Sequence, residues 1–143
     1  MSRALILYVE DEPDDVLFMR NAFEQAGLAD SLRAVGDGRD AIEYLAGNGA
    51  YVDRGQHPLP ALILLDLNLP VVSGFEVLKW MRGSAEFKRL PVVVFSSSAW
   101  DDDKVKALEL GANEFMEKPQ SAAGFVKVAE GLKERWLGKT RLC

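Results

Sequence analysis

Five short strand-like runs, separated by stretches with helical periodicity, are the feature that most constrains how this chain can fold. The runs cover residues 5–9, 31–35, 61–65, 91–95 and 114–117. The run at 61–65, ALILL, is apolar throughout, which is typical of a strand buried on both faces of a sheet. Strands that alternate with helices predict an α/β fold in which helices cover a parallel sheet.

The stretches between these runs carry signals for where helices begin and end. Pro13 suits a first helical turn, the acidic residues beside it complement the helix dipole, and Gly27 can end the helix. Ser73 and Glu76 have the spacing of a capping box, and Ser121 can cap the last helix. We expect helices at residues 14–26, 38–46, 73–83, 100–110 and 121–136. The sequence therefore predicts a doubly wound (βα)5 fold, with a flavodoxin-like five-stranded parallel sheet in the order 2-1-3-4-5.

The length and composition limit the number of domains. A chain of 143 residues with 48% hydrophobic and 27% charged residues can fill one core and keep a wetted surface. Residues 47–60, GNGAYVDRGQHPLP, have no periodicity, and we expect an exposed loop that is longer than the usual connection. We expect residues 1–143 to form a single domain that includes this extended loop.

Charge and hydropathy exclude several classes of function. The formal net charge of −5, from 22 acidic and 17 basic residues, gives the surface no general attraction for nucleic acid. The apolar run at 62–65 is far shorter than the roughly 20 residues that a membrane helix needs, so we expect a cytoplasmic protein. Cys143 has no second cysteine beside it and His57 is the single histidine, so we expect no soft-metal site.

Acidic residues follow two of the predicted strands at the point where each strand ends. Glu10 and Asp11 follow the first strand, and Asp66 follows the third. These strands are neighbours in the expected order, so we expect the three carboxylates to meet in one crevice. Carboxylates that lie so close repel one another unless they share a cation. Oxygen ligands select a hard cation, and a site with few protein carboxylates and several retained waters suits Mg2+ better than Ca2+.

Two further strand ends indicate that an anion joins the metal. Ser96 follows the fourth strand, and Lys118 follows the fifth. An ammonium and a hydroxyl, together with Mg2+, can hold the three equatorial oxygens of a transferring phosphoryl group. Asp66 is then the acceptor, because a carboxylate needs no base to deprotonate it at neutral pH.

The segments YVEDEPDD, LLDLNLP, VVVFSSS and FMEKP resemble the receiver domains of two-component response regulators, over essentially the whole chain. The resemblance implies a phosphoacceptor switch instead of an enzyme, with only slow self-phosphorylation from small donors and autodephosphorylation. It makes Asp66 the phosphoacceptor, and Glu10 and Asp11 the acidic pair that holds Mg2+. It also makes Asn68 the residue whose backbone carbonyl completes the metal shell, and Lys118 the partner of a phosphoryl oxygen.

Two residues depart from the commoner residues of that family at the positions that relay the switch. The resemblance makes Ser96 the hydroxyl residue drawn toward the phosphoryl group, and Phe115 the aromatic residue that follows it. Ser96 replaces the commoner Thr and is freer about χ1, while Phe115 replaces a frequent Tyr and cannot hydrogen-bond outward. We therefore expect any coupling between them to act through packing. The family also implies a cis peptide bond between Lys118 and Pro119.

The long loop, the phrase LPALILLDLNLPVVSGFEVL and the last helix resemble stand-alone regulators associated with phytochrome kinases. The implied partner is a sensor histidine kinase such as a phytochrome, and without an output domain the signal leaves by protein contacts or a phosphorelay. Residues 16–19, VLFM, span about 300° of a helix, so at least one faces outward, and Phe18 is our candidate for kinase docking. Trp100 and Trp136 either form a homodimer face or pack inside the molecule.

Two other functions compete with this interpretation. A haloacid-dehalogenase-like aspartate phosphatase also uses a strand-end Asp over Mg2+, but it needs a general acid two positions later, where this chain has Asn68. The nucleophile of such enzymes also follows the first strand, whereas Asp66 follows the third. An FMN binder of the same topology would need a phosphate loop rich in Ser, Thr and Gly where this chain has the acidic segment EDEPDD.

Overall fold

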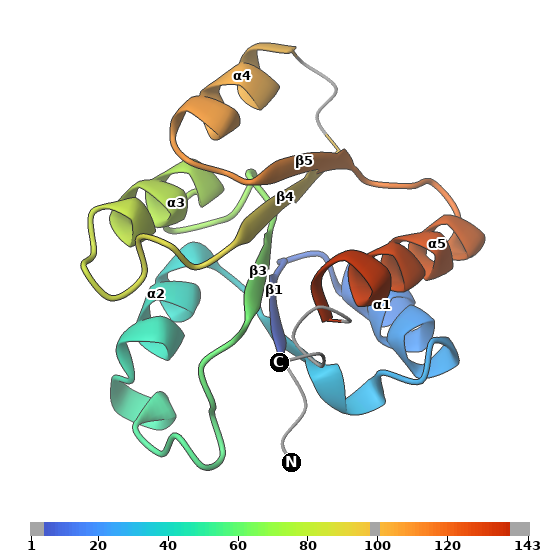
Figure 1. Ribbon diagram of the computed structural model, residues 1–143, viewed down its shortest axis with the longest axis horizontal. Coiled ribbons are helices and arrows are strands. Elements are labelled where there is room, and N and C mark those ends of the chain that lie inside the picture. The colour runs from blue at the N-terminus through green and yellow to red at the C-terminus, as the bar shows by residue number, and fades with distance from the viewer. Residues whose placement is uncertain (1–4, 98–100, 138–143) are drawn as a thin grey trace.

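The computed structural model describes residues 5–97 and 101–137, which form a five-stranded sheet between two layers of helices (Figure 1). Neighbouring strands pair in parallel, in the order β2-β1-β3-β4-β5. The strands are β1 (Ile6–Val9), β2 (Leu32–Val35), β3 (Leu62–Leu65), β4 (Val92–Ser96) and β5 (Glu114–Glu117). This order confirms the predicted doubly wound fold.

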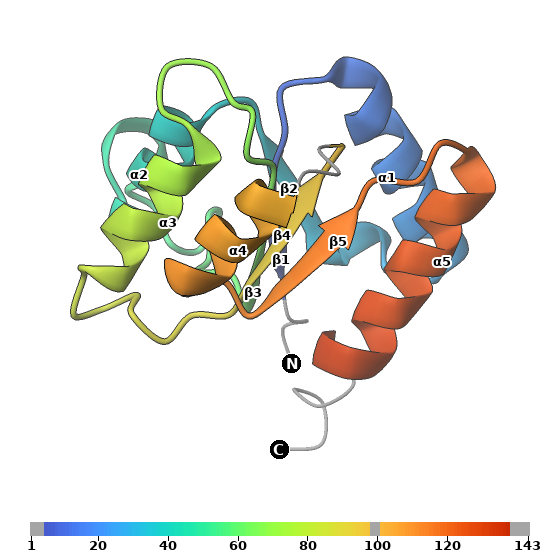
Figure 2. The same cartoon turned by 90° about the horizontal axis from the view of Figure 1, so that it is seen from above.

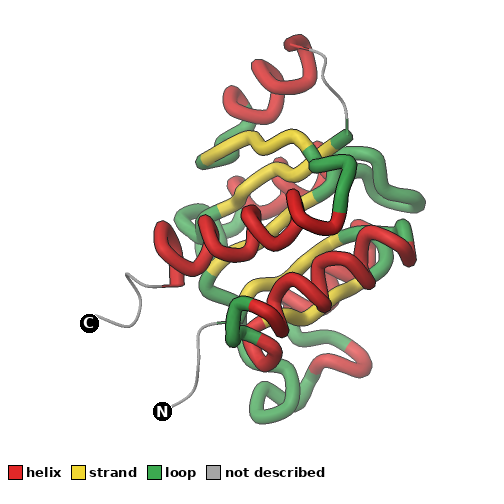
Figure 3. Tube along the Cα trace, turned by 90° about the vertical axis from the view of Figure 1, so that its right-hand side faces the viewer, coloured by secondary structure: helices red, strands yellow, loops and turns green. Residues whose placement is uncertain are grey.

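Helices α1 and α5 cover one face of the sheet, and α2, α3 and α4 cover the other (Figure 2). Seen from the side of the first layer, α1 and α5 lie next to each other across the strands (Figure 3). The helices are α1 (Pro13–Gln25), α2 (Gly38–Ala46), α3 (Gly74–Arg82), α4 (Asp101–Glu109) and α5 (Ala122–Leu132). A π-helical turn, Lys133–Leu137, continues α5, and 3-10 turns occur at Ala29–Ser31 and Gly49–Tyr51. The predicted helices are thus confirmed, with small shifts at their ends.

The sheet is buried on both faces because side chains along each inner strand alternate between two apolar cores. On β1, Leu7 and Val9 pack toward α2 and α3, whereas Ile6 and Tyr8 pack toward α1 and α5. Strand β3, with the sequence LILL, has no exposed residue. A strand in this position needs apolar side chains in both directions, which explains its uninterrupted sequence.

Side-chain caps fix where three of the helices begin. The Ser73 hydroxyl accepts a hydrogen bond from the Glu76 N–H at 3.3 Å, and the Ser121 hydroxyl accepts from the Gly124 N–H at 3.2 Å. Both serines were predicted as caps. Asp37 caps α2 in the same way, through a 2.7 Å bond from the N–H of Asp40 to its carboxylate.

The loop at 47–60 is largely exposed, as predicted, but its side chains tie it to α2. The Arg54 guanidinium donates to the backbone carbonyls of Tyr44 at 2.7 Å and Leu45 at 2.6 Å. The Tyr44 hydroxyl in turn donates to the carbonyl of Pro58 at 2.8 Å. These contacts satisfy carbonyl groups at the end of α2, and they give the loop a defined path that its lack of periodicity did not predict.

The outer surface of α1 carries apolar side chains. Leu17 is 55% exposed and Phe18 is 39% exposed, whereas Met19 is buried, which confirms that part of residues 16–19 faces outward. Trp136 packs against the core beneath α1 and α5. Of the two alternatives for this residue, a homodimer face or packing inside the molecule, the structure shows the second. Trp100 lies outside the described residues. Among the described helices, none combines the length and the apolar character that crossing a membrane requires.

Candidate metal and phosphoryl site

The register of the sheet brings the ends of β1 and β3 to the same level. Val9 pairs with Leu65, so the residues that follow them, Glu10 and Asp66, lie side by side at the carboxyl edge of the sheet. The N–H of Asp66 donates to the carbonyl of Val9 at 3.1 Å, which extends the pairing as far as the site. The two strand ends that were expected to be neighbours therefore lie together at this edge.

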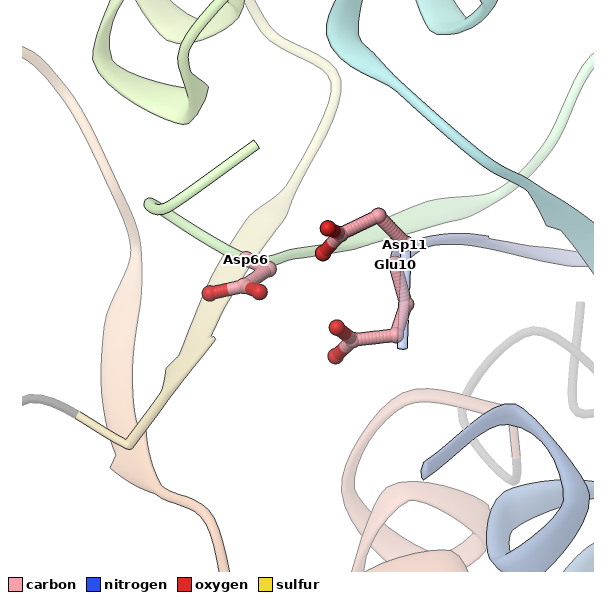
Figure 4. Close-up of side chains that lie close together, drawn as sticks. All are labelled: Glu10, Asp11 and Asp66. Atoms are coloured by element: carbon pink, nitrogen blue, oxygen red, sulfur yellow. The ribbon is translucent and has the colours of Figure 1, made fainter. Parts of the chain in front are cut away.

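Glu10, Asp11 and Asp66 form a cluster in which one carboxylate oxygen from each residue lies within 4.8 Å of the others. Figure 4 shows the three side chains close together beyond the ends of β1 and β3, with the carboxyl groups of Glu10 and Asp11 on the side of Asp66. Glu10 is 2% exposed and Asp66 is 4% exposed, while Asp11 lies open to solvent. The structure thus brings together the three carboxylates that the sequence analysis expected to meet.

The ammonium group of Lys118 lies among carboxylates. Its Nζ is 2.6 Å from Glu10 Oε1, 3.0 Å from Asp15 Oδ2 and 3.3 Å from Asp66 Oδ2. The backbone N–H of Lys118 donates to the carbonyl of Ser96 at 2.9 Å, so pairing between β4 and β5 carries the lysine to the site. Lys118 therefore contacts the same carboxylate, Asp66, that the sequence analysis placed beside it.

The crowding of charge changes the protonation of two groups. Burial raises the pKa of Glu10 to about 7, while the hydrogen bond from Lys118 lowers it and the nearby Asp66 carboxylate raises it. Burial lowers the pKa of Lys118, but hydrogen bonds to Glu10 and Asp15 outweigh that effect and hold the pKa above its ordinary value. Lys118 therefore stays protonated at neutral pH. Four carboxylates of the described site, including Asp11, face this one ammonium, and a divalent cation can offset the excess negative charge.

Two contacts at the site were missed by the sequence analysis. It explained the acidic residues at the start of α1 only through the helix dipole, whereas Asp15 binds Lys118 across 103 residues of sequence. It also gave no role to Tyr8, which falls within the predicted strand at residues 5–9, but the buried Tyr8 hydroxyl donates to Glu10 Oε1 at 3.1 Å. Burial raises the pKa of Tyr8, so the phenol keeps its proton as a donor. The contact of Asp15 has no local sequence signal, because it depends on how α1 packs in three dimensions. Tyr8 and Glu10, in contrast, are two residues apart at the end of β1, and side chains at this spacing share one face of a strand.

The remaining predicted residues lie along the same edge. Ser96 is the last residue of β4 and is fully buried. Asn68 is exposed on the loop after β3, and its N–H donates to Asp66 Oδ1 at 3.3 Å. Phe115 on β5 is partly buried and packs against the core on the α2 and α3 side.

The peptide bond between Lys118 and Pro119 was expected to be cis, but it is trans, as are all the described peptide bonds. The trans form is the lower-energy form of a bond before proline. In this form the Lys118 ammonium already reaches three carboxylates. The expectation from the family resemblance was therefore wrong for this structure.

Two glycines hold the loop between β3 and α3 close to its neighbours. A Cβ atom on Gly74 would lie 2.1 Å from the backbone oxygen of Asp66, and one on Gly38 would lie 2.0 Å from the backbone oxygen of Val72. Such distances exclude any larger residue without a shift of backbone. The start of α2 and the start of α3 thus fix the loop that carries Asn68 beside the carboxylates.

The chain matches the family model of the response regulator receiver domain over residues 6–130. The probable methanogenesis regulatory protein FilR2 of Methanothrix harundinacea is 36% identical over 137 residues, which cover 96% of this chain and 86% of that protein. The response regulator Rcp1 of Synechocystis sp. is 34% identical over 133 residues, which cover 93% of this chain and 88% of Rcp1.

Solved structures agree with these relatives. The phosphorylated cyanobacterial phytochrome response regulator RcpA is 33% identical with a TM-score of 0.87, and the match covers 96% of each chain. The Mn2+-bound form of Rcp1 is 34% identical with a TM-score of 0.82, and the match covers 94% of each chain. RcpA is a phytochrome response regulator, which agrees with the resemblance in sequence to regulators associated with phytochrome kinases. The chain belongs to the family of response regulator receiver domains.

Proposed function

We propose that this chain is a switch in a two-component system, which accepts a phosphoryl group on Asp66 from a sensor histidine kinase while Mg2+ is bound. The observation that carries the proposal is the meeting of Asp66 with Glu10, Asp11 and the Lys118 ammonium at one edge of the sheet. Membership of the receiver family supports it, because receivers are phosphoacceptor switches and not true enzymes.

The residues present suit a hard divalent cation. Glu10, Asp11 and Asp66 would hold Mg2+ through carboxylate oxygens, and the backbone carbonyl of Asn68 would complete the set of protein ligands. Their mutual distances of at most 4.8 Å and the excess of carboxylates over ammonium groups support this assignment. The Mn2+-bound structure of Rcp1 supports a divalent site in a relative. When bound, Mg2+ supplies positive charge that neutralises the phosphoryl oxygens.

The side chains of this protein would perform the transfer. An oxygen of Asp66 forms a bond to phosphorus, while the bond from phosphorus to the kinase histidine breaks and its electron pair stays on the imidazole nitrogen. Lys118 would pair with one phosphoryl oxygen, and the Ser96 hydroxyl would donate a hydrogen bond to another. The transfer needs no base, since the Asp66 carboxylate carries no proton to remove.

Ser96 and Phe115 would relay the phosphorylated state. Phe115 pairs with Val94, two residues before Ser96, so the two side chains project from the same face of adjacent strands. A shift of the buried Ser96 toward Asp66 would leave space that Phe115 can enter. Phe115 has no hydroxyl group that could hold its ring in an outward position by a hydrogen bond, so packing would control this movement.

The wider setting follows from the same proposal. We propose that residues 1–143 form a single receiver domain that acts in the cytoplasm, and that the signal leaves by protein contacts, a homodimer or a phosphorelay. The similarity to RcpA, a cyanobacterial phytochrome response regulator, supports a phytochrome as the kinase partner. The net charge of −5 disfavours direct contact with nucleic acid.

The proposal is tested by incubating the chain with acetyl phosphate and Mg2+ and measuring its intact mass. The parent should gain one phosphoryl group, about 80 Da, and the Asp66→Asn variant should gain none. A variant that gains the same mass as the parent would show that Asp66 is not the acceptor. The phosphatase alternative gains no support from the family or its relatives, and steady turnover of p-nitrophenyl phosphate would be needed to revive it.

A further inference from the structure

Asp15 contacts the site from α1, a helix that contributes none of the clustered metal-binding carboxylates. Its Oδ2 lies 3.0 Å from Lys118 Nζ, which is hydrogen-bonding distance for a charged pair. The Lys118 side chain is 10% exposed and that of Asp15 is 22% exposed, so water screens this pair less than it screens a surface pair.

Asp15 differs from the other carboxylates around Lys118 in one respect. Glu10 and Asp66 belong to the cluster that could hold a metal ion, and Asp15 does not. An ammonium group has three N–H donors, and Glu10, Asp15 and Asp66 each lie near it in the described structure. When a metal engages Glu10 and Asp66, Asp15 is the member of this set that stays fully available to Lys118.

We propose that Asp15 is a positioning residue, which holds the Lys118 ammonium beside Asp66 so that it can pair with the incoming phosphoryl group. The inference rests on the proposed function, in which Lys118 pairs with a phosphoryl oxygen. Lysine has a long and flexible side chain, so a fixed anion on one side of its ammonium reduces the freedom it must lose during transfer. Asp15 itself touches neither the phosphoryl group nor the acceptor.

The chain offers a matched control for this idea in Asp14. Asp14 precedes Asp15 in the first turn of α1 and is exposed. Changing either residue to Asn removes one negative charge from the same helix start, so the effects on the helix dipole and on net charge are alike. Only the change at Asp15 takes the negative charge away from the contact with Lys118.

The test compares rates of phosphorylation by acetyl phosphate with Mg2+ in the full chain. Asp15→Asn should slow the reaction by a factor on the order of 3 to 10, as expected for weakening one charge-assisted contact, and Asp14→Asn should match the parent. In a Lys118→Ala background, Asp15→Asn should have no further effect, because Asp15 acts through the lysine. Asp15→Glu, which keeps the carboxylate, should recover part of the rate.

Labelling of Lys118 by an amine-reactive reagent, followed by peptide mass spectrometry, gives a second measurement that requires no phosphorylation. Lys118 should be labelled faster in Asp15→Asn than in Asp14→Asn. The difference between these two labelling rates should grow when Mg2+ is added. Three results would overturn the inference and leave the proposed function intact. The first is an equal rate of phosphorylation or of Lys118 labelling in Asp15→Asn and Asp14→Asn. The second is faster phosphorylation of Asp15→Asn than of the parent, and the third is the same slowing by Asp15→Asn with Lys118 and with Lys118→Ala. A parent chain that gains no phosphoryl group would overturn both.

Discussion

Glu10 is the residue whose protonation controls the charge of the site. Burial raises its pKa from 4.5 to about 7, because a carboxylate is less stable away from water and beside Asp66, although Lys118 partly reverses the effect. The folded chain therefore binds a proton more tightly than the unfolded chain. In the metal-free protein, the stability that this proton contributes is complete below about pH 4.5 and is lost as the pH rises through about 7.

Binding of Mg2+ should follow the opposite trend, because the metal requires the ionised carboxylate. Titration calorimetry should find the affinity for Mg2+ roughly tenfold weaker at pH 6 than at pH 8, since a protonated ligand must lose its proton first. Glu10→Gln should bind Mg2+ more weakly and should lose most of this pH dependence. An affinity in the parent that does not change between these pH values would contradict the assignment of Glu10 as a ligand.

Val71 carries backbone strain next to the site. It has φ of 68°, its side chain is 73% exposed, and the flanking N–H of Val72 donates to the carbonyl of Pro70 at 2.8 Å. A positive φ costs conformational energy in a β-branched residue, and because Val71 is exposed, burial of its side chain does not offset this cost. Val71→Gly should raise the free energy of unfolding by about 0.5–1 kcal/mol, the relief of strain exceeding the added freedom of the unfolded chain.

Chemical denaturation of two single variants, Val71→Gly and Val72→Gly, tests whether the backbone at Val71 is strained. Val72 packs against the core and has no positive φ, so its replacement should lower the free energy of unfolding. If both glycine variants were less stable than the parent, Val71 would not be strained in solution.

At the scale of elements, the end of α2 depends on the loop that follows it. Arg54 donates to the carbonyls of Tyr44 and Leu45 and also to that of His57 at 3.1 Å. Arg54→Ala should therefore lower the free energy of unfolding by about 1–3 kcal/mol, since several hydrogen bonds from one charged group are lost. It should also speed proteolytic cleavage within residues 47–60.

Arg39→Ala is the control for that prediction. Arg39 pairs with Glu43 at 3.3 Å on the exposed face of α2, where its side chain is 73% exposed. An exposed pair of this kind contributes little, so the variant should lose less than about 0.5 kcal/mol. Similar losses in both variants would mean that Arg54 does not secure the loop.

The elements that could be predicted from sequence are those with a local signal. The apolar run at 61–65 predicts a central strand, and Ser73 and Ser121 predict helix starts, because each pattern reflects burial or hydrogen bonding within a few residues. The convergence of Glu10, Asp11 and Asp66 followed from strand order. The path of residues 47–60 could not be predicted, since its contacts come from side chains without any periodic pattern.

The site shows the same division. Residues at strand ends could be chosen from sequence because parallel strands end at one edge of the sheet. Asp15 could not, because its contact with Lys118 depends on how α1 packs beside the end of β5. The peptide bond before Pro119 was expected to be cis from the family alone, and no residue of the sequence reports on it directly.

At the scale of the whole molecule, α1 and α5 form one layer, and the outer face of α1 in that layer is exposed to solvent. Leu17 is 55% exposed there, whereas the Phe18 ring lies 5.5 Å from that of Phe125 and so also supports the contact between the two helices. Leu17 is therefore the cleaner probe of kinase docking. Leu17→Glu should slow transfer from the cognate kinase and leave the rate with acetyl phosphate unchanged, because only the kinase needs this surface.

Val105→Glu provides the comparison on the other layer. Val105 is 52% exposed on α4, so the substitution adds the same charge to a surface of similar exposure. It should leave both rates close to those of the parent. Equal slowing of kinase transfer by the two variants would show that the added charge, and not the α1 surface, is responsible.

The measurement that tests the whole account most directly is the position of the phosphoryl group, mapped by mass spectrometry after reaction with the phosphorylated kinase. We expect the phosphoryl group on Asp66 when Mg2+ is present, and we expect chelation of the metal to prevent its transfer. Modification of any other residue, or equal modification of Asp66 without a divalent metal, would contradict it.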